Sequence, residues 1–157
     1  MKLLKSHGLG NDYLVLHEGE LGGRGMVRGV CHRHIGPGGD GLLTAGPNGN
    51  CDYGLRIFNP DGSEAEKSGN GIRIYARYLV DHCGAPSSFT LNTLGGAVAC
   101  QVDPEQVTVE MGKATFVPRE IPVDLDVPEA VEQHVAAAGE EFVFTAVGVG
   151  NPHCVIF

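Results

Sequence analysis

The residues best suited to chemistry lie in one segment rich in glycine and asparagine, FNPDGSEAEKSGNG, at residues 58–71. This segment separates a strand-like run from the clearest helical pattern in the chain. Backbone N–H groups at a helix start bind anions such as carboxylates, helped by the positive end of the helix dipole. The side-chain amides of Asn59 and Asn70 can contact both a carboxylate and an ammonium group. Spacing alone favours a simpler interpretation, a tight turn followed by a helix cap.

Two further polar loops have the same character. HGLGND at residues 7–12 lies between two strand-like runs, and GNPHC at residues 150–154 follows another. A single loop of this composition is usually only a turn. Three of them in one small protein indicate loops gathered around a pocket.

The five cysteines are an odd number without C-x-x-C spacing, which is typical of reduced thiols in a cytoplasmic protein. Cys154 lies in an apolar run and is predicted to be a buried core thiol. The run Cys31-His32-Arg33-His34 contains metal-ligating residue types, but neighbouring residues on a helix do not face one another. It is therefore interpreted as a helix end.

Four motifs occur in a fixed order: HGLGNDY, RHIGPGGDGLL, FNPDGSEAEKSGNGIR and GNPHCV. Together they resemble the diaminopimelate epimerase family over nearly the whole chain. The resemblance implies a β-rich fold built twice, each half around a central helix, with a small zwitterionic amino acid bound between the halves. It also implies a cytoplasmic isomerase of lysine and cell-wall synthesis that converts LL- to meso-diaminopimelate. Two cysteines, one per half, would remove and return the α-proton, without metal, pyridoxal phosphate or nucleotide.

Carried over motif by motif, the resemblance assigns the substrate contacts. The position of the first catalytic cysteine is occupied by Ser68, and Gly41 lies where relatives often have a contacting glutamine. The implied substrate-binding residues are Asn11, Asn59, Gly69, Asn70, Asn151 and His153. Ser68 is predicted to be exposed at the start of the clear helix, facing Asn11 and Asn151.

Ser68 changes the chemistry expected at this position. A thiol has a pKa of about 8.5, which a helix N-terminus can lower. A serine hydroxyl is a far weaker acid and needs an adjacent base, and no histidine adjoins Ser68 in the sequence. The family's later motif, Glu-Arg followed by a Cys-Gly loop, does not occur in these 157 residues. Two alternatives therefore stand beside the epimerase: an amino-acid-binding pseudo-enzyme, and an enzyme resembling hydroxyproline dehydratases.

The elements that would position these loops are mostly strands. Apolar spacing predicts one clear helix over 71–82, ended by Gly84 and Pro86, and weaker helices over 25–33 and 128–138. We therefore predict an α+β fold, a curved, mostly antiparallel sheet or barrel wrapped around the central helix. Strands are predicted over 2–6, 12–17, 52–58, 88–93, 98–102, 106–111 and 142–149.

The proline-rich stretch 117–128 is the predicted boundary between an N-terminal domain, 1–116, and the incomplete start of a second, similar domain, 117–157. Strands without partners in this second part would expose Phe142, Phe144, Val147 and Val155. We then expect a homo-oligomer or disorder in that segment. The alternative is that these strands complete the sheet of the first domain.

Composition excludes some functions. The formal net charge of −8, with 11 basic residues scattered among 19 acidic ones, argues against nucleic-acid binding. No apolar run approaches the ~20 residues that a membrane span needs. No apolar signal-peptide core follows the first lysines, so a secreted protein is not expected.

Overall fold

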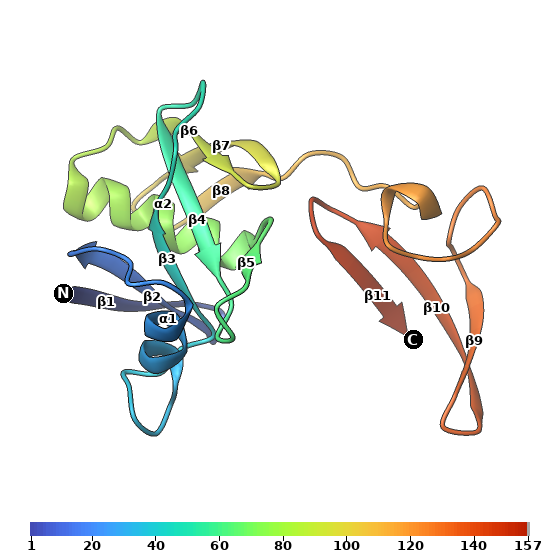
Figure 1. Ribbon diagram of the computed structural model, residues 1–157. Helices are drawn as coiled ribbons and strands as arrows, with labels where there is room; N and C mark the ends of the chain where they lie inside the picture. Colours follow the sequence, from blue (N-terminus) through green and yellow to red (C-terminus); the bar gives the residue numbers. More distant parts are fainter. Residues whose placement is uncertain (157) are drawn as a thin grey trace. The chain divides into compact units, whose positions relative to one another are not determined.

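The computed structural model describes residues 1–156, and the chain divides into two compact units, Met1–Glu110 and Met111–Phe157. The first unit is an eight-stranded sheet with two helices, and the second contains a three-stranded sheet (Figure 1). The α+β class predicted from the sequence is confirmed.

The sheet of the first unit has the order β1-β2-β3-β4-β6-β7-β8, with β5 paired to β4. Neighbouring strands are antiparallel except for the parallel pairs β2/β3 and β4/β6. Each predicted strand of this unit is present, with bounds differing by a few residues. The strands are β1 (Lys2–Gly8), β2 (Asn11–Glu18), β3 (Gly41–Ala45), β4 (Tyr53–Phe58), β5 (Glu64–Ala65), β6 (Ser88–Thr93), β7 (Gly96–Val102) and β8 (Val107–Glu110).

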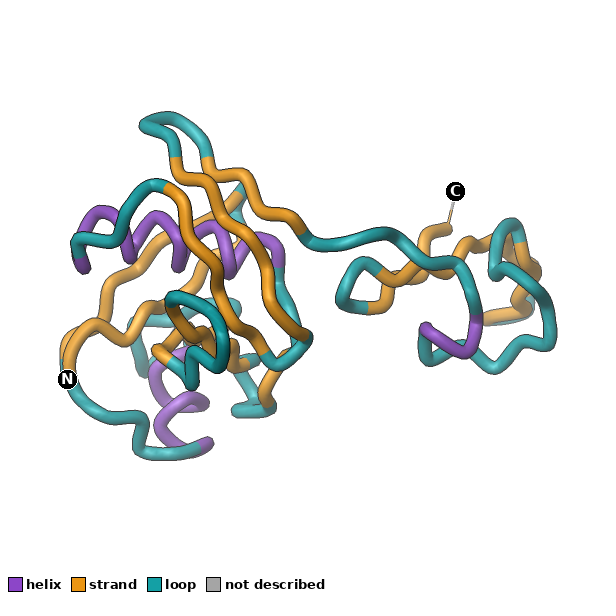
Figure 2. The backbone as a smooth tube through the Cα atoms, turned by 90° about the horizontal axis from the view of Figure 1, so that it is seen from above, coloured by secondary structure: helices purple, strands orange, loops and turns teal. Residues whose placement is uncertain are grey.

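Helix α2 (Gly69–Cys83) is the helix predicted over 71–82, and it begins two residues earlier than predicted. It ends at Gly84, whose φ of 71° lies in the left-handed region that glycine adopts without strain. The helix contacts β1, β2, β4, β7 and β8. Because these strands come from both ends of the sheet order, the sheet curves around α2 (Figure 2).

Strands β2 and β3 are buried on both faces, which explains their continuous apolar runs. On one face, Leu14 and Leu42 pack with Val27 and Val30 of helix α1 (Arg24–Cys31), a helix predicted over 25–33. On the other face Leu43 lies against α2 at Gly71, where an added Cβ would be 3.2 Å from the leucine Cδ2. Packing on both sides fixes the strand ends that carry the polar loops.

The second unit has a short 3-10 helix η1 (Pro118–Glu120) and the strands β9 (Gln133–Ala137), β10 (Glu140–Gly148) and β11 (Pro152–Ile156). These strands pair with one another in the order β11-β10-β9. Its core contains Ile121, Ala130, Phe144 and Ala146. Phe144 was expected to be exposed and is buried, whereas Val155 on the edge strand β11 is 37% exposed.

Two sequence predictions in this unit are wrong. Residues 133–137 were expected to belong to a helix, but they pair antiparallel with β10. The two-residue turn Ala138-Gly139 has positive φ at both positions, 53° and 83°, so Gly139 closes a hairpin instead of ending a helix. Cys154 was expected to be buried and is exposed, because β11 pairs with β10 on one side only.

Limited proteolysis tests the division of the chain. We expect trypsin to cut after Lys113 or Arg119, two exposed residues outside the strands, and to leave a resistant fragment that contains β1 to β8. Mass spectrometry of the fragments checks this result. Uniform resistance across residues 111–128, in a protein that light scattering shows to be monomeric, would argue for one continuous domain.

Candidate functional site

Ser68 is the N-cap residue of α2. Its backbone is extended, with φ −144° and ψ 113°, and its Oγ accepts a hydrogen bond from the Gly71 N–H at 3.1 Å. A serine in this role satisfies one of the backbone donors left free at a helix start. The side chain is half-buried, so the prediction that Ser68 is exposed is too strong.

Tyr13 lies within hydrogen-bond distance of Ser68 and was not singled out from the sequence. Its hydroxyl lies 3.0 Å from the Ser68 Oγ, and either oxygen can donate the hydrogen bond. The Tyr13 ring packs closely on Gly41, its partner on β3, because an added Cβ at Gly41 would lie 2.6 Å from the tyrosine Cε1. Gly41, which the motif resemblance places at a contact position, is therefore bordered by an aromatic ring.

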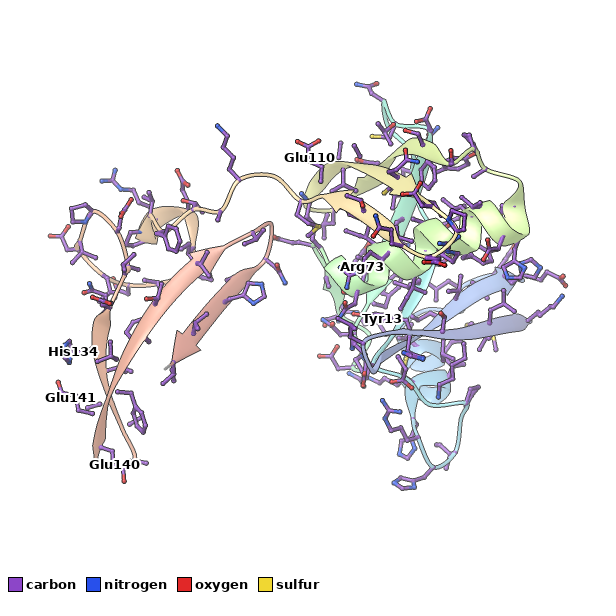
Figure 3. The ribbon with its side chains drawn as sticks, turned by 180° about the vertical axis from the view of Figure 1, so that it is seen from behind. Tyr13, Arg73, Glu110, His134, Glu140 and Glu141 are labelled. Carbon is purple, nitrogen blue, oxygen red and sulfur yellow. The ribbon has the colours of Figure 1, made fainter. Side chains whose placement is uncertain are left out.

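A line of polar side chains leads away from the helix start. The Asn70 Nδ2 donates to the Asn11 Oδ1 at 3.3 Å, and the Asn11 Nδ2 donates to the Asp40 Oδ2 at 3.0 Å. Arg73, one turn along α2, donates to the Asn70 Oδ1. Figure 3 shows Arg73 on α2 and Tyr13 on β2. Four of the predicted site residues, Asn11, Ser68, Gly69 and Asn70, are thus brought together.

Charged groups hold the Asn11 loop in place. Arg33 makes two hydrogen bonds to the Asp12 carboxylate, at 2.6 and 3.1 Å, and one to Asp40 at 2.6 Å. The Asp12 N–H donates to Asp40, and the Lys5 Nζ lies 3.1 Å from Asp12. Asp40 thus holds the end of the turn at Asn11 and Asp12, the first residues of β2. The hydrogen bonds from Arg33 are the main reason that the pKa of Asp12 lies well below its usual range.

This depressed pKa predicts acid sensitivity. A carboxyl group whose pKa is lower in the folded than in the unfolded protein stabilises the fold above the unfolded pKa of about 3.9. That contribution is lost as the pH falls from about 4 towards the folded pKa. We expect Asp12→Asn to lower stability at pH 6 and to show a weaker loss of stability between pH 4 and 2 than the unsubstituted protein. Urea unfolding at several pH values measures both effects.

Asp61→Asn is the matched control for this experiment. The pKa of Asp61 is also lowered, mainly by hydrogen bonds from Ser63, two residues away in an exposed turn, and to a smaller degree by the charge of Arg28. Because contacts between residues two positions apart can also form in the unfolded chain, we expect this substitution to change the acid response less than Asp12→Asn does. Equal acid responses of Asp12→Asn and the unsubstituted protein would show that the Arg33 contacts do not stabilise the fold.

Asn59 lies apart from the line of amides. It is exposed at the end of β4, where its Nδ2 donates to the Ser63 Oγ at 2.9 Å and its backbone N–H to the Ser63 carbonyl. Among residues 1–156 no hydrogen bond joins it to another predicted site residue. In this structure Asn59 stabilises the turn between β4 and β5, and its contact with a substrate stays a prediction.

Asn151 and His153 belong to the second unit. The His153 Nε2 and the Asn151 Oδ1 are 3.0 Å apart, at the turn that connects β10 with β11. Asn151 is half-buried and His153 is exposed. That Ser68 faces Asn151 stays a prediction.

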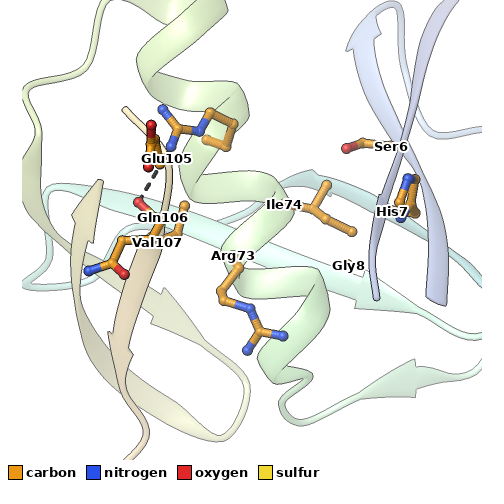
Figure 4. Close-up of a pocket in the computed structure, with 9 residues that line it drawn as sticks. Ser6, His7, Gly8, Arg73, Ile74, Glu105, Gln106 and Val107 are labelled. Carbon is orange, nitrogen blue, oxygen red and sulfur yellow. Dashed lines mark hydrogen bonds between the residues drawn. The ribbon is translucent and has the colours of Figure 1, made fainter. Parts of the chain in front are cut away.

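A cavity of about 220 Å³ lies beside α2. Arg73, Ile74 and Arg77 line it from the helix and residues 6–8 from β1 (Figure 4). Residues 105–107, in the turn before β8 and at its first position, complete the lining. The Arg77 guanidinium donates hydrogen bonds to the backbone carbonyls of Asp103, Pro104 and Gln106. Arg73 lines this cavity and also donates to the Asn70 Oδ1, so its side chain lies between the cavity and the amides at the helix start.

Within residues 1–156, no group of three or more His, Cys, Asp or Glu side chains is arranged to hold a metal ion. Over the same residues, no helix has the length and apolar character to cross a membrane.

The sequence profile of diaminopimelate epimerase matches residues 3–117. The chain belongs to the diaminopimelate epimerase family. It is 44% identical to diaminopimelate epimerase 2 of Nostoc sp., over 99% of this chain and 57% of that protein. It is 39% identical to the diaminopimelate epimerase of Desulfitobacterium hafniense, over all of this chain and 60% of that protein. The chain thus spans less than two-thirds of the length of these relatives.

Solved structures agree on the fold. A hydroxyproline epimerase from Agrobacterium vitis, crystallised with trans-4-hydroxy-L-proline, matches 98% of this chain and 50% of its own length, with a TM-score of 0.72 and 16% identity. A probable proline racemase from Agrobacterium radiobacter gives the same TM-score at 14% identity. At such low identity these likenesses show the fold, which is the one that the four motifs implied.

The residues missed from the sequence differ in how they could have been found. Arg73 stands three positions after Asn70, a spacing that brings helix side chains together, so the local sequence contained its signal. Tyr13 is 55 residues from Ser68, and no local pattern joins them. The same holds for Arg33 and Asp12.

Proposed function

We propose that this chain binds a zwitterionic amino acid at the start of α2 and contributes one half of the site of a diaminopimelate epimerase. The observation that carries the proposal is the convergence of Ser68, Asn70 and Asn11 at a capped helix N-terminus within the residues that match the family. The backbone amides of Gly69 and Asn70 are then available to a carboxylate, which the positive helix end favours. LL- or meso-diaminopimelate is the proposed substrate.

In this proposal Ser68 takes the place of the base that removes the α-proton. Its Oγ already accepts from the Gly71 N–H and lies within hydrogen-bond distance of Tyr13. These two donors and the helix end would stabilise an anion at this position, which suits a thiolate. A serine hydroxyl gains too little from them to be ionised near neutral pH. The arrangement thus supports binding more strongly than proton abstraction.

The second candidate function, an amino-acid-binding module without catalysis, is favoured by Ser68 itself. A third, an enzyme resembling hydroxyproline dehydratases, rests on the same serine, but the motifs HGLGNDY and FNPDGSEAE resemble the epimerase branch. Asn151 and His153 are proposed to complete the substrate contacts. The domain assignment, 1–116 followed by the start of a second domain, is likewise a proposal.

Solvent deuterium exchange tests the choice between enzyme and binder. The protein is incubated in D2O with meso-diaminopimelate, and NMR follows the α-hydrogens. An enzyme replaces an α-hydrogen by deuterium, whereas a binder shifts the ligand resonances without exchange. Absence of both exchange and binding, in a folded protein, would refute the proposed function.

A further inference from the structure

The two side-chain amides at the candidate site form one hydrogen-bonded chain that has a fixed direction. This series of hydrogen bonds begins at the Arg73 guanidinium, passes through Asn70 and Asn11, and ends at the Asp40 carboxylate. A guanidinium can only donate hydrogen bonds and an ionised carboxylate can only accept them. An amide between them must therefore turn its oxygen towards the arginine and its nitrogen towards the aspartate.

We propose that Arg73 and Asp40 are positioning residues that hold the amides of Asn70 and Asn11 in a single orientation. Each Nδ2 carries two hydrogens, and in the chain of contacts each uses one. In the described part of the protein, the second hydrogen of each amide makes no hydrogen bond. Two N–H donors from adjacent amides are suited to the two oxygens of a carboxylate. The positioning role therefore deepens the proposed binding of an amino-acid carboxylate and rests on it.

The surroundings support this orientation. Asp40 is held by the Arg33 guanidinium at 2.6 Å and by the Asp12 N–H at 3.1 Å, so its carboxylate is fixed before it meets Asn11. Gly8, at the end of β1, lies beside the other amide: an added Cβ there would be 3.3 Å from the Asn70 Oδ1. Asn70 and Asn11 are both half-buried, which restricts alternative rotamers and keeps water from replacing every contact.

The test uses NMR spectra of the side-chain amides in the full chain. In the unsubstituted protein we expect the NH2 groups of Asn70 and Asn11 to show dispersed resonances and slowed hydrogen exchange. Arg73→Met should remove both features, because nothing then fixes the Asn70 oxygen. Arg73→Lys should restore them, since an ammonium is also a donor only. Unchanged amide spectra in Arg73→Met would overturn the proposal.

Arg77→Met is the matched control. Arg77 stands one turn further along the same helix, but its guanidinium donates to carbonyls of residues 103–106 instead of to an amide side chain. We expect this variant to keep the Asn70 and Asn11 signals. If Arg73→Met and Arg77→Met disturb these signals alike, the effect is a general loosening of α2, and the positioning role is refuted.

Asp40 is tested in the same way from the other end. Asp40→Asn replaces an acceptor by a group that both donates and accepts, so the Asn11 signals should become averaged. Arg33→Met removes contacts that hold Asp12 and Asp40 but leaves the Asp40 carboxylate able to accept from Asn11, so it should weaken the Asn11 signals less than Asp40→Asn does. If Arg33→Met averages the Asn11 signals more than Asp40→Asn does, the ion pair orders Asn11, and the donor-to-acceptor direction of the hydrogen bonds does not.

Titration with meso-diaminopimelate separates this inference from the proposed function. We expect the affinity to fall about tenfold in Arg73→Met, the equivalent of one hydrogen bond of ordinary strength, and to stay within about twofold in Arg77→Met. If the unsubstituted protein shows ordered amides that depend on Arg73 but does not bind meso-diaminopimelate, the positioning role stands and the proposed substrate is wrong.

Discussion

The 157-residue protein is expected to show negligible inversion of LL- or meso-diaminopimelate, and Ser68→Cys alone is expected not to restore it. Inversion requires one group to remove the α-proton and another, on the opposite face of the carbon, to return one. The substitution supplies the first group only. The resemblance implies a second thiol in a Cys-Gly loop motif, which these 157 residues do not contain. Chiral chromatography of the two stereoisomers measures the inversion.

Alkylation shows whether the new thiol is functional. The Gly71 N–H, the Tyr13 hydroxyl and the helix N-terminus all favour a thiolate at this position. We therefore expect Ser68→Cys to react with iodoacetamide with a pKa below the usual value of about 8.5. Peptide mass spectrometry separates this reaction from that of Cys83, an exposed thiol at the other end of α2. Inversion by either protein, free of full-length enzyme, would contradict the two-thiol requirement.

Gly41→Ala is expected to destabilise the first unit by about 3 kcal/mol, the upper end of the usual cost of overpacking a core. The added Cβ would lie 2.6 Å from the Phe58 carbonyl oxygen and 2.6 Å from the Tyr13 ring. The carbonyl belongs to a paired strand and cannot withdraw, so the ring must move. We expect Tyr13 to lose its hydrogen bond to Ser68. Urea unfolding measures the stability, and the fluorescence of the tyrosines reports the altered packing.

Gly69→Ala is the control for this substitution. Gly69 begins α2, and an added Cβ would meet only the Arg73 Nη1, at 3.5 Å, which is an ordinary contact. Replacing a helical glycine by alanine stabilises a helix by about 0.5–1 kcal/mol. We expect this variant to be at least as stable as the unsubstituted protein. Similar destabilisation by both substitutions would show that Gly41 is not unusually confined.

The sequence by itself determined the features that depend on short-range patterns. Helix α2 was predicted because apolar residues recur at helical spacing and Gly84 supplies the left-handed end. Six of the eight strands of the first unit were predicted from apolar and β-branched runs between turn residues, and β3 and β5 were not. The motifs located Ser68 and Asn70 at a helix start, because capping involves residues only a few positions apart.

The failed predictions show where such patterns are insufficient. Residues 133–137 have local helical character, but pairing with β10 provides hydrogen bonds to a neighbouring strand and the turn at Gly139 permits the hairpin. Cys154 lies in an apolar run, yet an apolar sequence does not reveal whether a strand is covered on both sides. Strand pairing outweighs intrinsic preference when the two compete.

Only the tertiary structure decided which groups surround Ser68. Tyr13 is 55 positions away and Asn11 is 59 positions from Asn70, so their contacts depend on the register of β2 against β3 and on how α2 packs on the sheet. Register is set by the burial of whole strand faces, since a slip of one residue would turn every side chain to the opposite face. A local motif can name a candidate residue, but its partners are chosen by this long-range packing.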